Sequence, residues 1–79
     1  MSTITTLRIP KAAVSTQEGT VSVWLAADGQ SVTEGQPLYT LEFEKSTLDI
    51  DSPANGTLRH IVSAGTTLKV GEPIGEIIS

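Results

Sequence analysis

The centre of the chain is an alternating run of apolar and polar residues that predicts a β-hairpin. It reads Leu41-Glu42-Phe43-Glu44-Lys45-Ser46-Thr47-Leu48-Asp49-Ile50-Asp51. Successive side chains of a strand point to opposite faces, and the parity of the apolar positions changes between Phe43 and Leu48, so the run must turn back on itself. We expect Phe43 to pair with Leu48, and Leu41 with Ile50. This register buries all four on one face and leaves Lys45-Ser46 as the turn.

The two expected turn residues are unusual for such a short connection. Two-residue hairpins favour Asn-Gly or a leading glycine, because their turn types need a positive φ angle. Lys45-Ser46 offers neither. Departures from local rules concentrate at functional positions, which makes a lysine at the apex of a hairpin a candidate functional residue. The alternative is a solvated surface lysine in a type I turn.

The segments on either side of this hairpin are two copies of one strand-turn-strand unit. Gly19-Thr20-Val21 returns as Gly56-Thr57-Leu58. These first positions are 37 residues apart. Further positions match at a separation of 36 residues: Gly29 with Gly65, Val32 with Leu68, Gly35 with Gly71, Pro37 with Pro73, Leu38 with Ile74 and Leu41 with Ile77. We expect the one-residue difference near residue 28, and at that alignment His60 matches Val23. The repeat predicts two halves that pack across a pseudo-twofold axis.

Composition and turn signals predict an all-β fold. Val, Ile and Thr supply 24 of 79 residues, while seven glycines and four prolines interrupt the apolar runs. Glycine follows Asp28, Glu34, Asn55, Ala64 and Val70 between these runs, as turns require. We therefore expect residues 1–79 to form a single domain, a flattened barrel or sandwich of two small antiparallel sheets.

Charge and cysteine content exclude several function classes. The net charge is −4, and the five cationic residues are spread along the chain, which disfavours nucleic acid and anionic membranes as partners. The absence of cysteine excludes disulfides and thiolate zinc sites. The predicted register sets Glu42 opposite Asp49, but no calcium-loop spacing or nearby histidine accompanies them, so we expect no metal site. His60 is expected in a strand with its ring hydrogen-bonded, and no catalytic residue is identified.

Sequence similarity to a known family covers nearly the whole chain. The matching segments are Ile9-Pro10, Glu18-Gly19-Thr20-Val21, Trp24-Leu25, Asp28-Gly29-Gln30-Ser31-Val32, Glu34-Gly35-Gln36-Pro37-Leu38, Glu42-Phe43-Glu44-Lys45-Ser46, Ser52-Pro53-Ala54-Asn55-Gly56 and Val70-Gly71-Glu72-Pro73-Ile74. In these segments the chain resembles the biotinyl/lipoyl attachment domain, and most closely the lipoyl domain of a dihydrolipoyl acyltransferase (E2) of 2-oxo acid dehydrogenase complexes.

The resemblance implies a carrier function centred on one lysine. The family's lipoyl motif, Glu-x-Asp-Lys-Ala, stands here as Glu42-Phe43-Glu44-Lys45-Ser46, with Glu in place of Asp and Ser in place of Ala. It implies N6-lipoylation of Lys45 and recognition by the modifying enzyme through Glu42, Glu44 and Ser46. Biotinyl domains carry Met-Lys-Met at this turn, and neither methionine is present, so lipoate is expected and biotin is the runner-up. The remaining alternative is an unmodified barrel that acts as an interaction module.

The resemblance also implies partners and a location. A lipoate ligase or a lipoyl/octanoyl transferase would modify the lysine. A thiamine-diphosphate-dependent E1, an E2 acyltransferase core and an E3 dihydrolipoyl dehydrogenase would then act on the attached group, while the domain itself would be non-catalytic. We expect a cytoplasmic protein, or a protein of the mitochondrial matrix if the source is eukaryotic. The insertion at residues 11–17, which the second half lacks, is expected to help a partner dehydrogenase recognise the domain.

Overall fold

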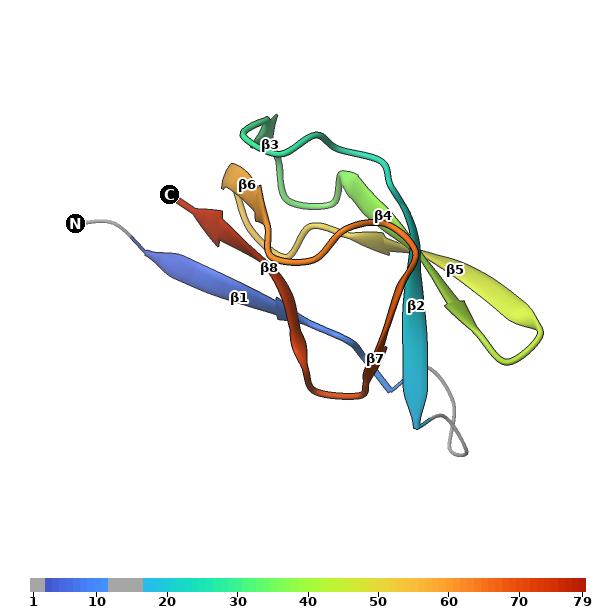
Figure 1. The fold of residues 1–79 in the computed structure, drawn as a ribbon. Helices are drawn as coiled ribbons and strands as arrows, with labels where there is room; N and C mark the ends of the chain where they lie inside the picture. Colours follow the sequence, from blue (N-terminus) through green and yellow to red (C-terminus); the bar gives the residue numbers. More distant parts are fainter. Residues whose placement is uncertain (1–2, 12–16) are drawn as a thin grey trace.

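The chain folds as two antiparallel sheets that face each other. The computed structural model describes residues 3–11 and 17–79, so most of the expected recognition insertion, residues 12–16, lies outside the described residues. In the described part the strands are β1 (Ile4–Arg8), β2 (Glu18–Trp24), β3 (Ser31–Val32), β4 (Pro37–Phe43), β5 (Ser46–Asp51), β6 (Gly56–His60), β7 (Thr66–Lys69) and β8 (Pro73–Ile78). The sheet orders are β1-β8-β6-β3 and β5-β4-β2-β7 (Figure 1).

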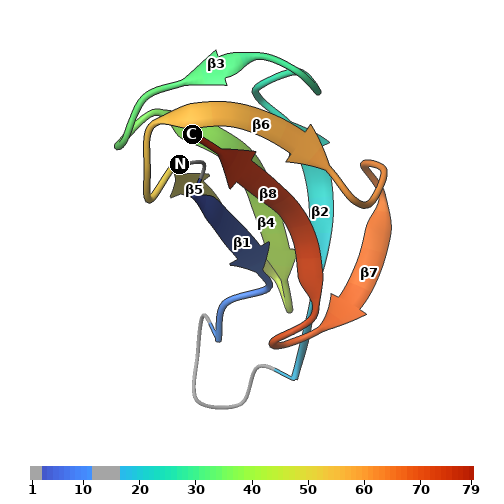
Figure 2. The same cartoon turned by 90° about the vertical axis from the view of Figure 1, so that its left-hand side faces the viewer.

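This architecture confirms the predicted all-β barrel-sandwich. Figure 2 shows both sheets curving around one interior. No helix occurs among the described residues, and hence none there is long and apolar enough to cross a membrane. Four of the five predicted turn glycines are confirmed, since Gly29, Gly35, Gly65 and Gly71 lie in turns with positive φ, whereas Gly56 is the first residue of β6.

The core lies between the inner faces of the two sheets. Its fully buried members include Val21, Leu38, Leu41, Leu58, Ile74 and Ile77. Tyr39 is buried among them, and burial raises the pKa of its phenol to about 12. Close backbone approach also shapes this core: a Cβ added to Gly56 would lie 2.6 Å from the carbonyl oxygen of Ile78. Glycine is therefore needed at this position for contact distance as well as for its φ of 155°.

The strand registers confirm the pseudo-twofold axis. In the β4–β5 ladder Leu41 faces Leu48 and Tyr39 faces Ile50, and the register shifts between Tyr39 and Pro37, which faces Asp51. The β8–β1 ladder repeats this pattern. Ile77 faces Thr5 and Gly75 faces Leu7, and the register then shifts between Leu7 and Arg8, so that Arg8 faces Pro73. The axis therefore exchanges β4 with β8 and β5 with β1. The same relation exchanges β2 with β6 and β7 with β3.

The predicted position of the one-residue difference between the halves is wrong. In β2 Val21 faces Leu41 and Val23 faces Thr40, so Ser22 is an extra residue in a β-bulge. The β6–β8 ladder runs through the equivalent positions without a bulge. The difference therefore lies at residue 22, inside a strand, and not near residue 28. As a result His60 is the counterpart of Trp24, and its predicted match with Val23 is also wrong.

Trp24 and His60 stack on each other near the axis that relates them. Their ring centroids are 3.9 Å apart and their planes differ by 11°. The Trp24 Nε1 donates to the Val62 carbonyl at 3.0 Å, and the His60 Nε2 lies 3.0 Å from the Ala26 carbonyl. Because a carbonyl only accepts, this contact places a proton on the His60 Nε2. The expected strand position and hydrogen-bonded ring of His60 are thus confirmed.

The same symmetry relates the central hairpin to the two ends of the described chain. Thr3 and Ser79 exchange backbone hydrogen bonds, Thr3 N to Ser79 O at 3.1 Å and Ser79 N to Thr3 O at 3.0 Å. They extend the β1–β8 ladder at the position that Phe43 and Ser46 occupy in the β4–β5 ladder. The barrel therefore closes one ladder with a turn and leaves its counterpart open. Figure 1 shows the turn and the chain ends on opposite sides of the molecule.

The stacked pair leads to a prediction about stability. Replacing His60 by alanine removes one hydrogen bond and one ring-stacking contact, which together are worth about 1–3 kcal/mol. Thermal and urea unfolding of His60→Ala should show this loss. His60→Phe, which retains a ring for stacking, should lose less. Arg59→Ala, at the exposed neighbouring position, is the control and should stay within about 0.5 kcal/mol of the parent. Equal stability of His60→Ala and Arg59→Ala would contradict the role assigned to the stack.

Candidate functional site

The central hairpin forms as predicted, but its register differs from the predicted one. Each residue at the end of β4 pairs with the residue two positions earlier in β5 than expected. Phe43 faces Ser46 and Leu41 faces Leu48, so the two turn residues are Glu44 and Lys45. The predicted Lys45-Ser46 turn is therefore wrong. The prediction that Leu41, Phe43, Leu48 and Ile50 share one face holds, because the observed and predicted pairings differ by two positions along a strand and two positions restore the same face. Leu48 is nevertheless 46% exposed.

The outer face of the hairpin explains why the observed register is preferred. The Thr40 hydroxyl donates to the Asp49 carboxylate at 2.9 Å, across the pair that these residues form. Glu42 faces Thr47, and the predicted pairing of Glu42 with Asp49 is not formed. That pairing would set two carboxylates directly opposite each other, which is destabilising in a ladder. The observed register avoids this repulsion.

Glu44 has an unusual backbone conformation for its residue type. It is the first of the two turn residues and has a φ of 52°. Glu44 alone among the described non-glycine residues has a positive φ. Two-residue hairpins require such a conformation, and glycine adopts it without a steric penalty. The turn is therefore unusual, as the sequence indicates, but it is formed by Glu44-Lys45 and not by Lys45-Ser46.

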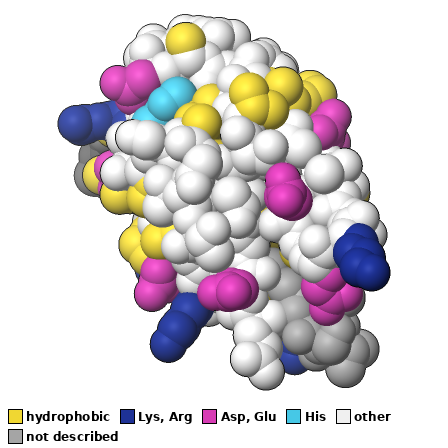
Figure 3. Space-filling model, turned by 45° about the vertical axis from the view of Figure 1, so that its right-hand side comes forward, with side chains coloured by type: hydrophobic (Ala, Val, Ile, Leu, Met, Phe, Trp, Pro, Cys, Tyr) yellow, Lys and Arg dark blue, Asp and Glu magenta, His cyan; other side chains and the backbone are white. Residues whose placement is uncertain are grey.

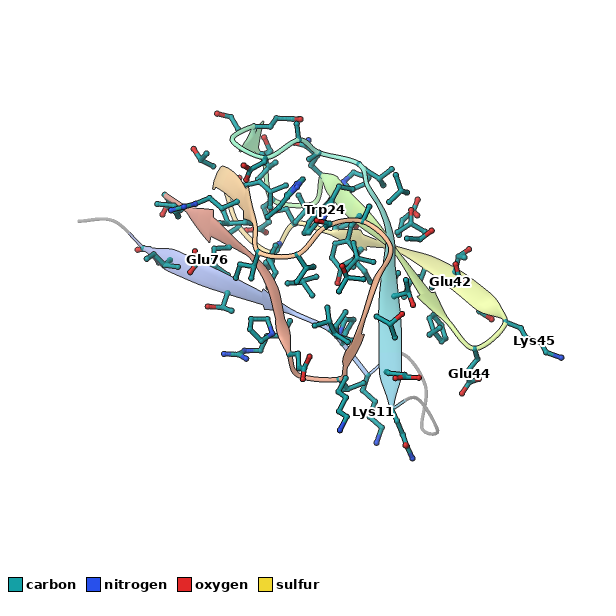
Figure 4. The ribbon with its side chains drawn as sticks, viewed as in Figure 1. Lys11, Trp24, Glu42, Glu44, Lys45 and Glu76 are labelled. Carbon is teal, nitrogen blue, oxygen red and sulfur yellow. The ribbon has the colours of Figure 1, made fainter. Side chains whose placement is uncertain are left out.

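Lys45 is exposed at the apex of the hairpin. Figure 4 shows its side chain extending away from the barrel, while Glu44 leaves the turn in a different direction and Glu42 lies on the adjoining strand. Lys11 lies at another end of the molecule. On the face drawn in Figure 3, Lys and Arg side chains lie apart from one another. The fold therefore presents one lysine on a projecting hairpin, where a second protein can reach its amine.

The other predicted site residues lie on the same hairpin. Glu42 is exposed on the outer face of β4, Glu44 is in the turn, and Ser46 is exposed at the first position of β5. All three lie near Lys45 because they belong to the same β4–β5 hairpin. No pocket is found beside them in the described part of the chain, and no group of three His, Asp or Glu side chains there is arranged to hold a metal ion. The hairpin leaves the side chains of Lys45 and its neighbours Glu44 and Ser46 exposed.

The conformation of Glu44 yields a prediction about stability. Glu44→Gly should have a higher melting temperature than Glu44→Ala, which loses the same side-chain groups but keeps the Cβ, because relief of the left-handed conformation outweighs the greater freedom of glycine in the unfolded chain. The expected gain is up to about 1 kcal/mol. Glu42→Gly, in the adjacent strand, is the matched control and should lower the melting temperature. Differential scanning calorimetry of the three variants measures the effect. A melting temperature of Glu44→Gly no higher than that of Glu44→Ala would show that no strain resides at this position.

Comparisons with known proteins agree with this geometry. The Biotin_lipoyl family model, described as "Biotin-requiring enzyme", matches residues 5–77. The chain is 39% identical over 70 residues to the dihydrolipoyllysine-residue succinyltransferase component of the 2-oxoglutarate dehydrogenase complex of Rickettsia bellii, covering 87% of this chain and 18% of that protein. The corresponding Bacillus subtilis protein is 35% identical over 72 residues, with coverages of 90% and 17%.

A third relative belongs to a different system. The dihydrolipoyllysine-residue acetyltransferase component of the acetoin cleaving system of Cupriavidus necator is 36% identical over 74 residues, which cover 92% of this chain and 20% of that protein. The chain thus spans about a fifth of the length of these relatives. Because the family model extends over nearly all of the described fold, the chain belongs to the biotin/lipoyl attachment-domain family.

Proposed function

We propose that this chain is a lipoyl carrier domain of a 2-oxo acid dehydrogenase-type multienzyme complex, lipoylated on Lys45. The observation that carries the proposal is the exposed lysine at the apex of the two-residue hairpin, in a domain of the biotin/lipoyl attachment family. The relatives named as dihydrolipoyllysine-residue acyltransferases support lipoate over biotin. The absence of methionine on either side of Lys45 favours the same choice. The domain would be a non-catalytic carrier.

The residues of the hairpin fit a covalently attached group. Acylation of the Lys45 Nζ converts a hydrated cation into a neutral amide at the end of a flexible stem. When bound, a lipoyl group supplies a dithiolane that carries acyl units and electrons. The β4–β5 ladder holds the base of the stem in a defined place, anchored by the buried Leu41 and the Thr40–Asp49 hydrogen bond. Because Lys45 is exposed at the apex of the hairpin, successive active sites could reach the arm.

Three neighbouring residues are proposed to guide the modifying enzyme. Glu42 and Glu44 place carboxylates on the outer face and in the turn, and Ser46 follows the lysine at the start of β5. These charges lie on the projecting part of the hairpin, so an enzyme that approaches Lys45 meets them first. Such groups contribute to the orientation and specificity of an encounter more than to the stability of the fold.

The proposed partners follow from this carrier role. A lipoate ligase or lipoyl/octanoyl transferase would attach the group. A thiamine-diphosphate-dependent E1, an E2 acyltransferase core and an E3 dihydrolipoyl dehydrogenase would then use it in turn. We propose the cytoplasm, or the mitochondrial matrix of a eukaryote, as the site of action, because these compartments would hold such complexes.

The attachment site can be tested by mass spectrometry. Protein from cells supplied with lipoate and biotin should show one lipoyl increment in its intact mass, and peptide mapping should place it on Lys45. Lys45→Arg should show no increment, while Lys11→Arg and Lys69→Arg should be modified like the parent. A biotinyl increment would support a carboxyl carrier instead. Modification of Lys45→Arg, or no modification of the parent by an active ligase, would exclude the proposed function.

Recognition by Glu42 leads to a separate prediction. Glu42→Gln should slow lipoylation of Lys45 at least several-fold, because it removes a charge that the enzyme reads. It should leave stability within about 0.5 kcal/mol, since the side chain is exposed. Glu34→Gln, the same change at an exposed position between β3 and β4, is the matched control for both measurements. An unchanged rate for Glu42→Gln in a lipoate ligase assay would remove Glu42 from the recognition surface.

A further inference from the structure

The hairpin that carries Lys45 has an apolar side near its tip. Leu48 faces Leu41 across the ladder, but Leu41 is fully buried whereas Leu48 is 46% exposed. Phe43, the last residue of β4, lies on the same face and is half-buried against the core. We call Phe43 and Leu48 the apolar side of the hairpin. Figure 1 shows that the β4–β5 hairpin projects beyond the rest of the barrel.

The pseudo-twofold axis supplies an internal reference for this surface. The positions equivalent to Phe43 and Leu48 in the β8–β1 ladder are Ser79 and Thr5. The same backbone ladder therefore forms with polar residues at both positions. Closure of the barrel does not require an apolar pair there. The pair is present only in the ladder that ends in Lys45.

The opposite side of the hairpin is polar and negatively charged. It carries Glu42, Thr47 and the Thr40–Asp49 hydrogen-bonded pair. An uncharged aliphatic chain gains nothing by displacing water from carboxylates, whereas it removes apolar surface from water when it covers Leu48. The two sides of the hairpin thus differ in their affinity for a chain attached at its apex.

We propose that Phe43 and Leu48 form a resting surface for the aliphatic chain attached to Lys45, a proposal that rests on the proposed acylation of that lysine. Leu48 is three residues from Lys45, about 10 Å along a strand. An extended lysine stem with an octanoyl or lipoyl chain exceeds this length. The attachment makes the contact intramolecular, so even a weak surface is populated at the millimolar effective concentrations that short tethers produce. The contact would be shallow and readily released.

The first test uses the lipoylated domain and methyl NMR. Lipoylation should shift the Leu48 methyl resonances and give NOEs between them and the methylene protons of the attached chain. Leu25 is the matched control, since it is the same residue type and is 47% exposed elsewhere on the surface. Its methyl groups should not change. Leu48→Gln should abolish the chain NOEs to Phe43 while Lys45 stays modified. An arm with no NOE to Leu48 or Phe43 would overturn the proposal.

A second test is independent of any modifying enzyme. The chain contains no cysteine, so Lys45→Cys provides a single thiol at the apex. Alkylation with an octyl reagent should perturb the Leu48 methyl groups, and alkylation with iodoacetamide should not. Equal effects of the two adducts would overturn the resting surface. If the octyl adduct contacts Leu48 but the parent protein is never acylated on Lys45, the resting surface is supported as a physical property and the proposed function fails.

Discussion

The stack of Trp24 on His60 is the interaction on which the arrangement of the two halves depends. The two rings are symmetry counterparts, and each hydrogen-bonds a carbonyl two residues beyond the other ring's position, Val62 for Trp24 and Ala26 for His60. The contact therefore ties the end of β2 in one sheet to the end of β6 in the other. In a domain of 79 residues without disulfides, such a link between sheets compensates for a small core.

The fixed relation of the halves decides where the lysine stands. Because β4–β5 and β8–β1 are equivalent ladders, the barrel has two equivalent projecting ends. One end holds the described chain ends, which pair through Thr3 and Ser79, and the other is closed by Glu44 and Lys45. Lys45 at the closed end therefore lies on the opposite side of the molecule from the described chain ends (Figures 1 and 4).

Two details of the hairpin depart from local preference. Glycine occupies the other positive-φ positions among the described residues, whereas the turn beside Lys45 holds a glutamate at 52°. Leu48 remains exposed where the equivalent position in the other half is Thr5. Both features cost the isolated domain something, in backbone conformation or in exposed apolar area. They occur together at the lysine, which is where a recognition surface would need them.

The sequence by itself determined the fold class, the repeat, the turn glycines and the candidate lysine, because these depend on residue type and on the period of two along a strand. The register of the hairpin and the bulge at Ser22 were decided only in the tertiary structure. Registers that differ by two positions bury the same face, so the apolar pattern could not distinguish a Lys45-Ser46 turn from a Glu44-Lys45 turn. The separation of Glu42 from Asp49, two carboxylates that the other register would set opposite each other, favours the observed turn across strands. Likewise, the pairing of His60 with Trp24 depends on where β2 absorbs one extra residue, which is fixed by the ladder it forms with β4 and not by any local sequence feature.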